Sequence, residues 1–562
     1  MDPIQFEVTK NALASLTEEM GAALHRAAYS TNIKTRLDFS SAIFDARLRV
    51  LAQALAQPSH LGSLPHSVPN AVREYGVDQL GPGDGLIVND PHRGAVHLND
   101  IALISPVHAR TGELLGFVAN VAHHVDVGGG APGSLAPARD LYQEGLIVPP
   151  VRLVRAGQVV PDVMRMIVAN IRAPRESAGD FRAQVAANHV GARRLAELVE
   201  RLGRTVFTQF CDDLIDYTSR RTRAALALLP HGEFSAEDFL DGDGFTDDPI
   251  RIAATLRNGP DGVVIDLAGS APQVRGSLNC SYSMTFSGVA FVLKTLVDPD
   301  IPVNEGFYRS FTLHVPEGTV TNARPPAAVA GGWEVAFRVA EVLYRALADA
   351  LPNRIVAATK GTICNVAFGG MRPNGGYYAY YETVAGGGGA RPTKDGMDGI
   401  QTHIHNTENA PVEEVELNYP FRVLRFGLIP DSEGPGRFRG GLGVCRDYWF
   451  PNHRVTFSIL ADRGRFAPWG LFGGGSARTA RVIRDPDGEA QVLPLKGSVE
   501  LRAGEVISVQ TPGGGGYGPI SDRDPDAVRH DVRVDKVSTA RARDVYHVAP
   551  DPVRPGPNEV GS

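Results

Sequence analysis

Histidine and aspartate side chains gather in one window of the sequence, between residues 90 and 126. Five of the chain's 16 histidines fall inside it. Its histidines and aspartates are Asp90, His92, His97, Asp100, His108, His123, His124 and Asp126. Imidazole together with carboxylate suits Zn²⁺, Mn²⁺ or Fe²⁺, and two carboxylates without sulfur favour Mn²⁺ or Zn²⁺. A single histidine more often caps a turn or makes a surface hydrogen bond, but the cluster as a whole predicts a divalent-metal site.

The elements around this window can bring its ends together. A glycine-rich turn at 81–85 precedes a short apolar strand at 86–89. Residues 101–107 and 114–127 alternate in polarity like the two arms of a hairpin. The strand, the following loop and the hairpin can therefore meet around one point, and the alternation puts His123 on the apolar face of its arm.

Asp38 is a second candidate, far upstream of the window. It begins an apolar strand expected at 39–44, where a carboxylate is costly to bury unless it is paired or ligated. The residues alone favour an ordinary capping or strand-edge aspartate over a ligand.

Scattered polar residues in otherwise tight segments form a further set. They are Asn279, Thr285, Asn304, Arg309, Glu334 and the run Thr402-His403-Ile404-His405-Asn406-Thr407. These side chains could line a substrate pocket, and a turn or capping role is an equally good interpretation for each.

Three glycine runs, 386–389, 473–475 and 513–516, resemble phosphate-binding loops in composition only. None has the form GxxxxGK[ST], and none reads GxGxxG between a strand and a helix. Tight turns and close backbone packing are the preferred interpretation. Cys280 lies in a segment that departs from the nucleophile-elbow pattern GxSxG, so it is expected to be a buried small hydrophobe.

Composition narrows the classes of protein. The chain has 562 residues, 43% hydrophobic, with a net charge of −7 and no long Lys/Arg block, which argues against a nucleic-acid or anionic-membrane surface. Four cysteines lie far apart, so neither a disulfide framework nor a thiolate zinc site is expected. With neither a leader pattern nor an apolar stretch of about 18 residues, the chain is expected to be cytoplasmic.

Periodicity predicts an α+β fold with several sheets and a β-rich C-terminal part. Helices are expected from Asp2-Pro3 to about residue 30, at 63–75, through most of 160–230, and at 335–351 before Pro352. Leu195, Leu198, Leu202 and Phe207 are expected on one helical stripe. Strand patterns dominate 250–320 and everything after 400. The expected regions are a metal-site region (1–155), a helical region (156–235), a substrate region (236–400), a β-rich region of glycine turns (401–520) and a polar, partly disordered tail (521–562).

Taken together, several segments closely resemble the hydantoinase B/oxoprolinase family. The segments are RLDFSSAIFD, NDPHRGAVHLNDIALISPV, GFVANVAHHVDVGGGAPGS, LYQEGLIVPPVRL, PDIPVNEGFYR, GGARPTKDGMDGIQTH, FRGGLGVCRDYWF and TPGGGGYGPISDRDP. They occur in family order and cover essentially the whole chain. The resemblance implies a hydantoinase B-like fold and ATP-dependent hydrolysis of a cyclic amide such as a hydantoin, 5-oxoproline or another lactam.

The resemblance also implies roles for particular residues. The metal ligands would be Asp38, His97, Asp100 and His123, which overrides the capping interpretation of Asp38. His124, Asp126 and Asp90 would be catalytic residues that support the ligands or face the substrate, and His124 or Asp126 would orient ligands or shuttle protons. From the polar residues themselves, and not from the resemblance, the substrate-binding set is expected to be His92, Asn279, Thr285, Asn304 and His403. His92 and His405 depart from the usual family pattern, and these departures bear on the identity of the substrate.

A partner completes the expected enzyme. ATP would be bound by a hydantoinase A-type subunit of a hetero-oligomer, (αβ)2 or higher, and would activate a carbonyl oxygen as its phosphate ester. Hydrolysis would follow at the Mn, Zn or Fe ion of this chain. Two alternatives stay open: a subunit of an acetone- or acetophenone-type carboxylase, and a structural subunit whose metal only stabilises it.

Overall fold

The computed structural model describes residues 2–54 and 57–549, and within them the strands form four sheets. The first sheet is antiparallel throughout. In order across the sheet it contains β2 (Val50–Gln53), β1 (Phe39–Asp45), β5 (Leu114–His123), β4 (Asp100–His108), β3 (Gly85–Val88), β6 (Val151–Arg155) and β7 (Gln158–Val159). The expected hairpin is therefore the centre of this sheet, with β5 ending four residues before the predicted boundary.

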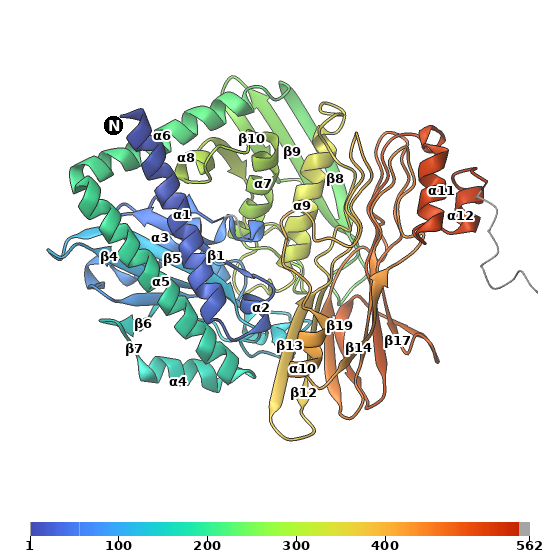
Figure 1. Cartoon of the computed structure of the whole chain (residues 1–562), viewed down its shortest axis with the longest axis horizontal. Helices are drawn as coiled ribbons and strands as arrows, with labels where there is room; N and C mark the ends of the chain where they lie inside the picture. Colours follow the sequence, from blue (N-terminus) through green and yellow to red (C-terminus); the bar gives the residue numbers. More distant parts are fainter. Residues whose placement is uncertain (1, 55–56, 550–562) are drawn as a thin grey trace, which may run out of the picture.

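Helices cover both faces of the first sheet, which explains why β1, β4 and β5 are almost wholly buried. On one face α1 (Pro3–Ala27), capped by the Asp2 side chain, packs with α5 (Pro174–Leu202) over the sheet. Figure 1 shows these two helices crossing the sheet side by side. On the other face α3 (Ser63–Tyr75) lies against β4 and β5, with the bounds that the sequence predicts. Short helices at Thr31–Lys34 (α2) and Pro161–Ala169 (α4) flank this layer.

The long helical region is interrupted at Gly203, whose positive φ of 80° separates α5 from α6 (Arg204–Leu226). The predicted stripe therefore spans two helices, since Leu195 and Leu198 lie on α5 and Phe207 lies on α6. All three are nevertheless buried in one core cluster, because the two helices fold back onto the same apolar layer.

The second sheet has the order β11 (Phe311–His314), β10 (Gly262–Asp266), β9 (Ile250–Gly259) and β8 (Gly232–Leu240). Helix α9 (Gly332–Leu347) packs on β8 and β9, and α7 (Tyr282–Leu296) packs on α9. The strand prediction for 250–320 is wrong across α7 and across α8 (Glu305–Tyr308). Helix α7 is buried on nearly every side, so it has no polar face from which a helical period could be recognised.

The C-terminal half is β-rich, as the sequence predicts. One sheet has the order β13 (Tyr377–Thr383), β12 (Asn365–Met371), β16 (Val455–Leu460) and β19 (Lys496–Leu501). The other has the order β14 (Arg422–Leu428), β15 (Val444–Trp449), β20 (Val506–Gln510), β17 (Arg481–Arg484) and β18 (Gln491–Leu493). An aromatic core that includes Phe368, Tyr448 and Phe457 lies between them. Since β12 pairs with β13 on one side and with β16 on the other, the boundary expected at residue 400 falls inside this sheet.

The glycine runs pack backbone against backbone. The Gly441 N–H donates to Gly388 O at 2.8 Å, and the Gly514 N–H donates to Gly441 O at 2.9 Å. A Cβ atom on Gly514 would lie 2.0 Å from Gly388 O, so no larger residue fits. The preferred interpretation of these runs as close packing is confirmed.

The end of the chain differs from the expected polar tail. Residues 521–549 form α11 (Pro525–Arg533) and α12 (Thr539–Asp544), which share a small apolar core. They are held to the glycine-rich region by the bidentate Arg439–Asp531 pair, at 3.0 and 3.1 Å. The rest of the predicted tail, 550–562, lies outside the described residues.

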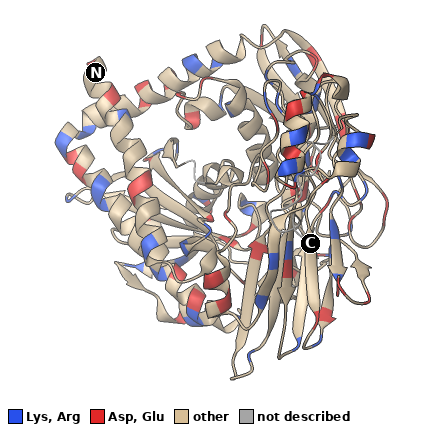
Figure 2. Ribbon diagram, turned by 45° about the vertical axis from the view of Figure 1, so that its right-hand side comes forward, with Lys and Arg blue, Asp and Glu red and all other residues tan. Residues whose placement is uncertain are grey.

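Surface and cysteine features agree with the composition. Basic and acidic residues are interspersed along the outer helices (Figure 2). Within the described chain no helix is both long and apolar enough to cross a bilayer.

All four cysteines are buried and free, and burial raises the pKa of Cys280 to about 12, as expected of a small hydrophobe rather than a nucleophile.

Candidate metal centre

The structure brings His97, Asp100 and His123 together at one end of the central hairpin. Asp100 is the first residue of β4 and His123 the last of β5, and the two are cross-strand partners. One ligating atom from each of the three residues lies within 4.8 Å of the others. His123 Nδ1 is 3.2 Å from Asp100 Oδ1, and His97 Nδ1 is 3.6 Å from Asp100 Oδ2. All three side chains are buried.

Asp38 lies beside this group but outside its tightest part. Its backbone oxygen accepts the His123 N–H at 3.1 Å as β1 begins, and its Oδ2 is 3.9 Å from His123 Nδ1. Gln57 Nε2 donates to its Oδ1 at 3.2 Å. Asp38 is therefore held in place near His123 from both the backbone and the side chain.

His60 is a member of the site that sequence reasoning missed. Its Nε2 lies 3.4 Å from Asp100 Oδ2, its Nδ1 lies 3.1 Å from the Ser40 hydroxyl, and it is fully buried. No spacing pattern connects it with the 90–126 window. His60 belongs to a short helical turn, Pro58–His60, that comes after β2 in the sequence, and only the folded structure brings this turn beside Asp100.

The electrostatics favour the metal-ligating forms of Asp100 and His97, whereas at His60 the carboxylates of Asp100 and Asp38 outweigh burial and raise the pKa. Burial disfavours the Asp100 carboxylate, but the imidazoles of His97, His60 and His123 outweigh burial and hold the pKa of Asp100 well below its usual range. Burial lowers the pKa of His97 to about 4, so its imidazole is neutral near pH 7.

Unsatisfied atoms supply a test of fit for a metal ion. Among the described residues, His97 Nδ1, both Asp100 carboxylate oxygens, His123 Nε2 and His60 Nε2 are buried without a hydrogen-bond partner. Each such buried atom costs about 1–3 kcal/mol if it has neither a hydrogen-bond partner nor a metal ion beside it. A divalent cation satisfies imidazole nitrogen and carboxylate oxygen together, so the residues present fit the metal that the sequence predicts.

Two aromatic rings from outside the first sheet lie against the imidazoles of His97 and His123. The Trp333 ring, at the start of α9, lies 4.9 Å from His97 between centroids, and the Tyr381 ring of β13 lies 4.6 Å from His123. The Tyr381 hydroxyl donates to Asn365 Oδ1 at 2.7 Å. The first and third sheets and the helix on the second sheet therefore meet at this centre.

The residues expected to be catalytic lie outside the three-residue group. His124 points toward α5, where its Nε2 is 3.1 Å from Gln184 Oε1 and its ring lies 4.4 Å from the Phe181 ring between centroids, tilted by 34°. Asp126 accepts hydrogen bonds from the Gly128, Gly133 and Arg172 backbone N–H groups of its own loop and its neighbour. Asp90 caps a short helical turn and pairs with Arg93. Their contacts position loops, and a role in proton transfer stays a prediction.

The expected substrate-facing residues lie apart from one another. Asn279 makes hydrogen bonds to the backbone of Val274, Gly276 and Ala328, Thr285 donates to Thr321 O, and Asn304 caps α8. These contacts match the turn and capping interpretation that the sequence left open. His92 is partly buried near the backbone of Ala327. His403 is buried among Phe337, Tyr344 and Phe291, and burial lowers its pKa to about 4.

The sequence matches the family described as Hydantoinase B/oxoprolinase over residues 2–520. It is 37% identical over 554 residues to an uncharacterised protein of Methanocaldococcus jannaschii, covering 98% of this chain and 96% of that protein. It is 33% identical over 552 residues to a Pseudomonas sp. protein named as the B-type subunit of a D-/L-hydantoinase, covering 94% and 92%. It is 32% identical over 532 residues to a 5-oxoprolinase of Dictyostelium discoideum, covering 92% of this chain and 40% of that protein.

Two solved structures have similar folds. An ATP-dependent caprolactamase from Pseudomonas jessenii superposes with a TM-score of 0.90 at 29% identity, covering 98% of this chain and 97% of that one. A nucleotide-free acetone carboxylase also gives a TM-score of 0.90, at 20% identity, covering 97% of this chain and 79% of that one. At that identity the second likeness shows the fold alone. The predicted fold class is confirmed.

Proposed function

Because this chain belongs to the hydantoinase B/oxoprolinase family, we propose that it is the ring-opening subunit of an ATP-dependent cyclic-amide hydrolase. The observation that carries the proposal is the buried group of His97, Asp100 and His123, which among the described residues includes ligating atoms without a hydrogen-bond partner. A family resemblance alone identifies a fold, whereas this group supplies a place for the chemistry.

An unactivated amide needs both a nucleophile and stabilisation of charge on its oxygen. A divalent ion would be held by His97, Asp100 and His123, with Asp38 as a fourth ligand. When bound, it would supply a water of lowered pKa and polarise a carbonyl. Asp100, kept ionised by the surrounding imidazoles, supplies the negative charge that binds such an ion. His60 contacts the second oxygen of Asp100 and so fixes the direction of the carboxylate.

The surrounding side chains protect and orient the centre. Trp333 and Tyr381 pack against the ligand imidazoles and exclude bulk water from that side, which strengthens electrostatic interactions inside. Asp38 orients His123 through its backbone oxygen and is itself oriented by Gln57.

ATP binding is assigned to a partner. The glycine runs are filled by backbone contacts and have no P-loop pattern, which supports nucleotide binding outside this chain. The 5-oxoprolinase relative is much longer than this chain, as expected if the same region there is joined to further domains. We assign a hydantoinase A-type ATP-binding partner in a hetero-oligomer, (αβ)2 or higher.

Reconstitution tests the proposal. The chain would be co-purified with a hydantoinase A-type ATPase and incubated with ATP and, separately, 5-oxoproline, a hydantoin or caprolactam. ADP release coupled to ring opening of one of these is expected, together with bound Mn²⁺ or Zn²⁺ in the purified chain. Ring opening that proceeds unchanged without ATP would contradict the proposal.

The same assay separates the carboxylase alternative that the sequence resemblance left open. Labelled bicarbonate is added with acetone or acetophenone in place of the lactam. Label in the product would replace the hydrolase proposal. His97→Ala addresses the structural-subunit alternative, since complete loss of turnover in a well-folded variant excludes a metal that only stabilises.

A further inference from the structure

A row of buried amide side chains lies between α5 and the centre of the first sheet. Gln184 Nε2 donates to Ile101 O at 2.8 Å and to Asn120 Oδ1 at 2.9 Å, and Gln184 Oε1 lies 3.1 Å from His124 Nε2. Gln184 and Asn120 are fully buried. The polar atoms of the Gln184 side chain therefore have partners on both β4 and β5.

The row continues one helical turn along α5. Asn120 Nδ2 donates to Gln184 O at 2.9 Å and to Asn188 Oδ1 at 2.7 Å. Asn188 Nδ2 donates to Leu103 O at 3.0 Å and to the Ser105 hydroxyl at 3.1 Å. An amide buried without partners costs about 1–3 kcal/mol, whereas a complete polar network fixes one arrangement of the elements it joins.

Gln184 contacts the neighbours of two candidate ligands. Ile101 directly follows Asp100 on β4, and His124 directly follows His123 at the end of β5. The β4–β5 register ends at this pair, where strand ends are most free to fray. Gln184 reaches the pair from α5, while Trp333 and Tyr381 cover the ligand imidazoles.

We propose that Gln184 is a positioning residue for the metal centre. By joining Ile101 O and His124 Nε2 it fixes how the two ligand-bearing strand ends lie relative to each other, so that Asp100 and His123 converge on one ion. This inference rests on the proposed function, in that these residues hold a divalent metal. Supporting side chains of this kind typically change metal affinity by roughly 10–100-fold when replaced.

The test compares Gln184→Met with Asn188→Leu. Both replace a buried amide on α5 with an apolar side chain of similar shape, but Asn188 contacts β4 at Leu103 and Ser105, farther from Asp100. Affinity for Co²⁺ is measured by competition with a chromophoric chelator, the visible spectrum of the cobalt form reports ligand geometry, and circular dichroism with thermal unfolding reports the fold.

We expect Gln184→Met to bind Co²⁺ roughly 10–100-fold more weakly and with an altered visible spectrum. Asn188→Leu is expected to lose comparable thermal stability while keeping wild-type affinity and spectrum. If Gln184→Met does not fold, Gln184→Asn, which keeps the amide but is one methylene shorter, is expected to show the same spectral change with a smaller loss of affinity.

Wild-type affinity and spectrum in a folded Gln184 variant would overturn the positioning role, and so would an equal loss of affinity in Asn188→Leu. A wild-type chain that binds neither Co²⁺ nor Mn²⁺ would instead overturn the metal-dependent function, and the positioning role with it. The wild-type measurement therefore distinguishes a failure of the positioning role from a failure of the metal-dependent function.

Discussion

Lys360 is the residue whose burial has the clearest consequence for pH. Its ammonium group is fully buried and donates to Val384 O at 2.7 Å and to Gln401 Oε1 at 2.6 Å. Burial lowers its pKa to about 8, while Cys364 and Glu334 oppose that shift. The folded protein therefore releases this proton at a lower pH than the unfolded chain does.

The sign of the pH effect follows from this difference. Between about pH 8 and pH 10.5 the unfolded chain binds the Lys360 proton and the folded protein does not, so raising the pH favours folding. We predict that wild type gains about 3 kcal/mol of unfolding free energy relative to Lys360→Met across that range. Urea unfolding of both proteins at about pH 7 and about pH 10 measures it. A difference between the two that does not vary with pH would contradict the prediction.

The candidate centre shows which members of a site can be predicted from the sequence and which cannot. His97, Asp100 and His123 were predictable because their types are distinctive and a hairpin joins them within one window. His60, Trp333 and Tyr381 were not, because each reaches the centre from an element that only the tertiary fold places there. Asp126 was predicted from the same window, but its carboxylate accepts hydrogen bonds from the backbone of its own loop and lies outside the three-residue group.

At the scale of elements, the glycine-rich segments make a testable prediction. A Cβ on Gly514 would lie 2.0 Å from Gly388 O, whereas one on Gly427 of β14 would meet nothing within 4 Å. We predict that Gly514→Ala costs more than about 4 kcal/mol or prevents folding, because the backbones must separate. Gly427→Ala is the matched control and should change stability by less than about 1 kcal/mol. Similar urea midpoints for the two variants would show that the packing is not tight.

The elements also show where sequence patterns stop being informative. Helix α3 was predicted with its observed bounds because it has one apolar face, with residues such as Leu64, Val68 and Val72 buried. Helix α7 was missed because its Thr, Val, Phe and Tyr residues favour strands and because it is buried on nearly every side. The break at Gly203 was also missed, since apolar spacing continues across it.

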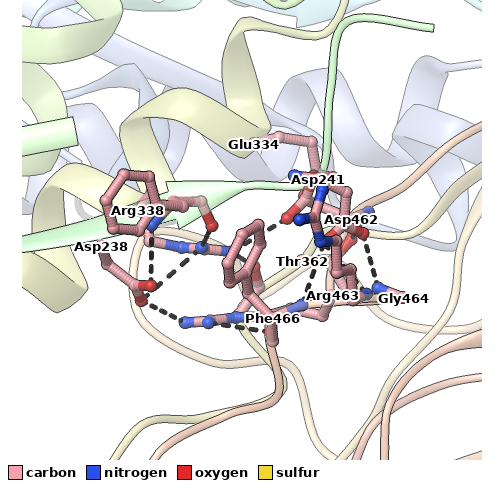
Figure 3. A network of polar contacts seen from close by, with 12 residues as sticks. Asp238, Asp241, Glu334, Arg338, Thr362, Asp462, Arg463, Gly464 and Phe466 are labelled. Atoms are coloured by element: carbon pink, nitrogen blue, oxygen red, sulfur yellow. Dashed lines mark hydrogen bonds and ion pairs between the residues drawn. The ribbon is translucent and has the colours of Figure 1, made fainter. Parts of the chain in front are cut away.

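Across the whole molecule, a buried ionic cluster fastens the second sheet to the third (Figure 3). Arg338 of α9 lies 3.1 Å from Asp462, Lys496 of β19 lies 2.8 Å from the same carboxylate, and Arg463 lies 3.1 Å from Asp238 of β8. Burial opposes the ionised form of Asp462, but Lys496 and Arg338 lower its pKa to about 2. The halves of the molecule are therefore joined by charges that depend on one another.

Removing one member of this cluster should be costly. We predict that Arg338→Met lowers the free energy of unfolding by about 3–5 kcal/mol, because it leaves buried carboxylates undercompensated. Arg257→Met, which breaks a pair with Glu233 between half-exposed side chains, is the control and should leave stability nearly unchanged. Denaturant unfolding followed by intrinsic fluorescence compares them, and equal effects would show that the cluster does not join the sheets.

The proposed metal centre is another place where the sheets meet, so a bound metal should stabilise more than its own hairpin. The three clustered candidate ligands lie on β4, on β5 and in the turn before β4. Trp333 of α9 packs against the His97 ring, and Tyr381 of β13 packs against the His123 ring. A ligand that binds only the folded state stabilises it by about 2.7 kcal/mol at a hundred times its Kd. Because those rings pack on the ligands themselves, that stabilisation should extend to all three layers.

Hydrogen–deuterium exchange after chelation tests this coupling. We predict faster exchange at the start of β4, the end of β5, the first turn of α9 and in β13, and no change in α11 and α12, which have a separate core. His97→Ala should already exchange quickly at the first four places and should not respond to the chelator, which separates metal loss from chelator effects. An increase confined to β4 and β5 would mean that Trp333 and Tyr381 merely cover the centre. An increase that also reaches α9 and β13 would mean that the bound ion holds the N-terminal sheet to the rest of the molecule.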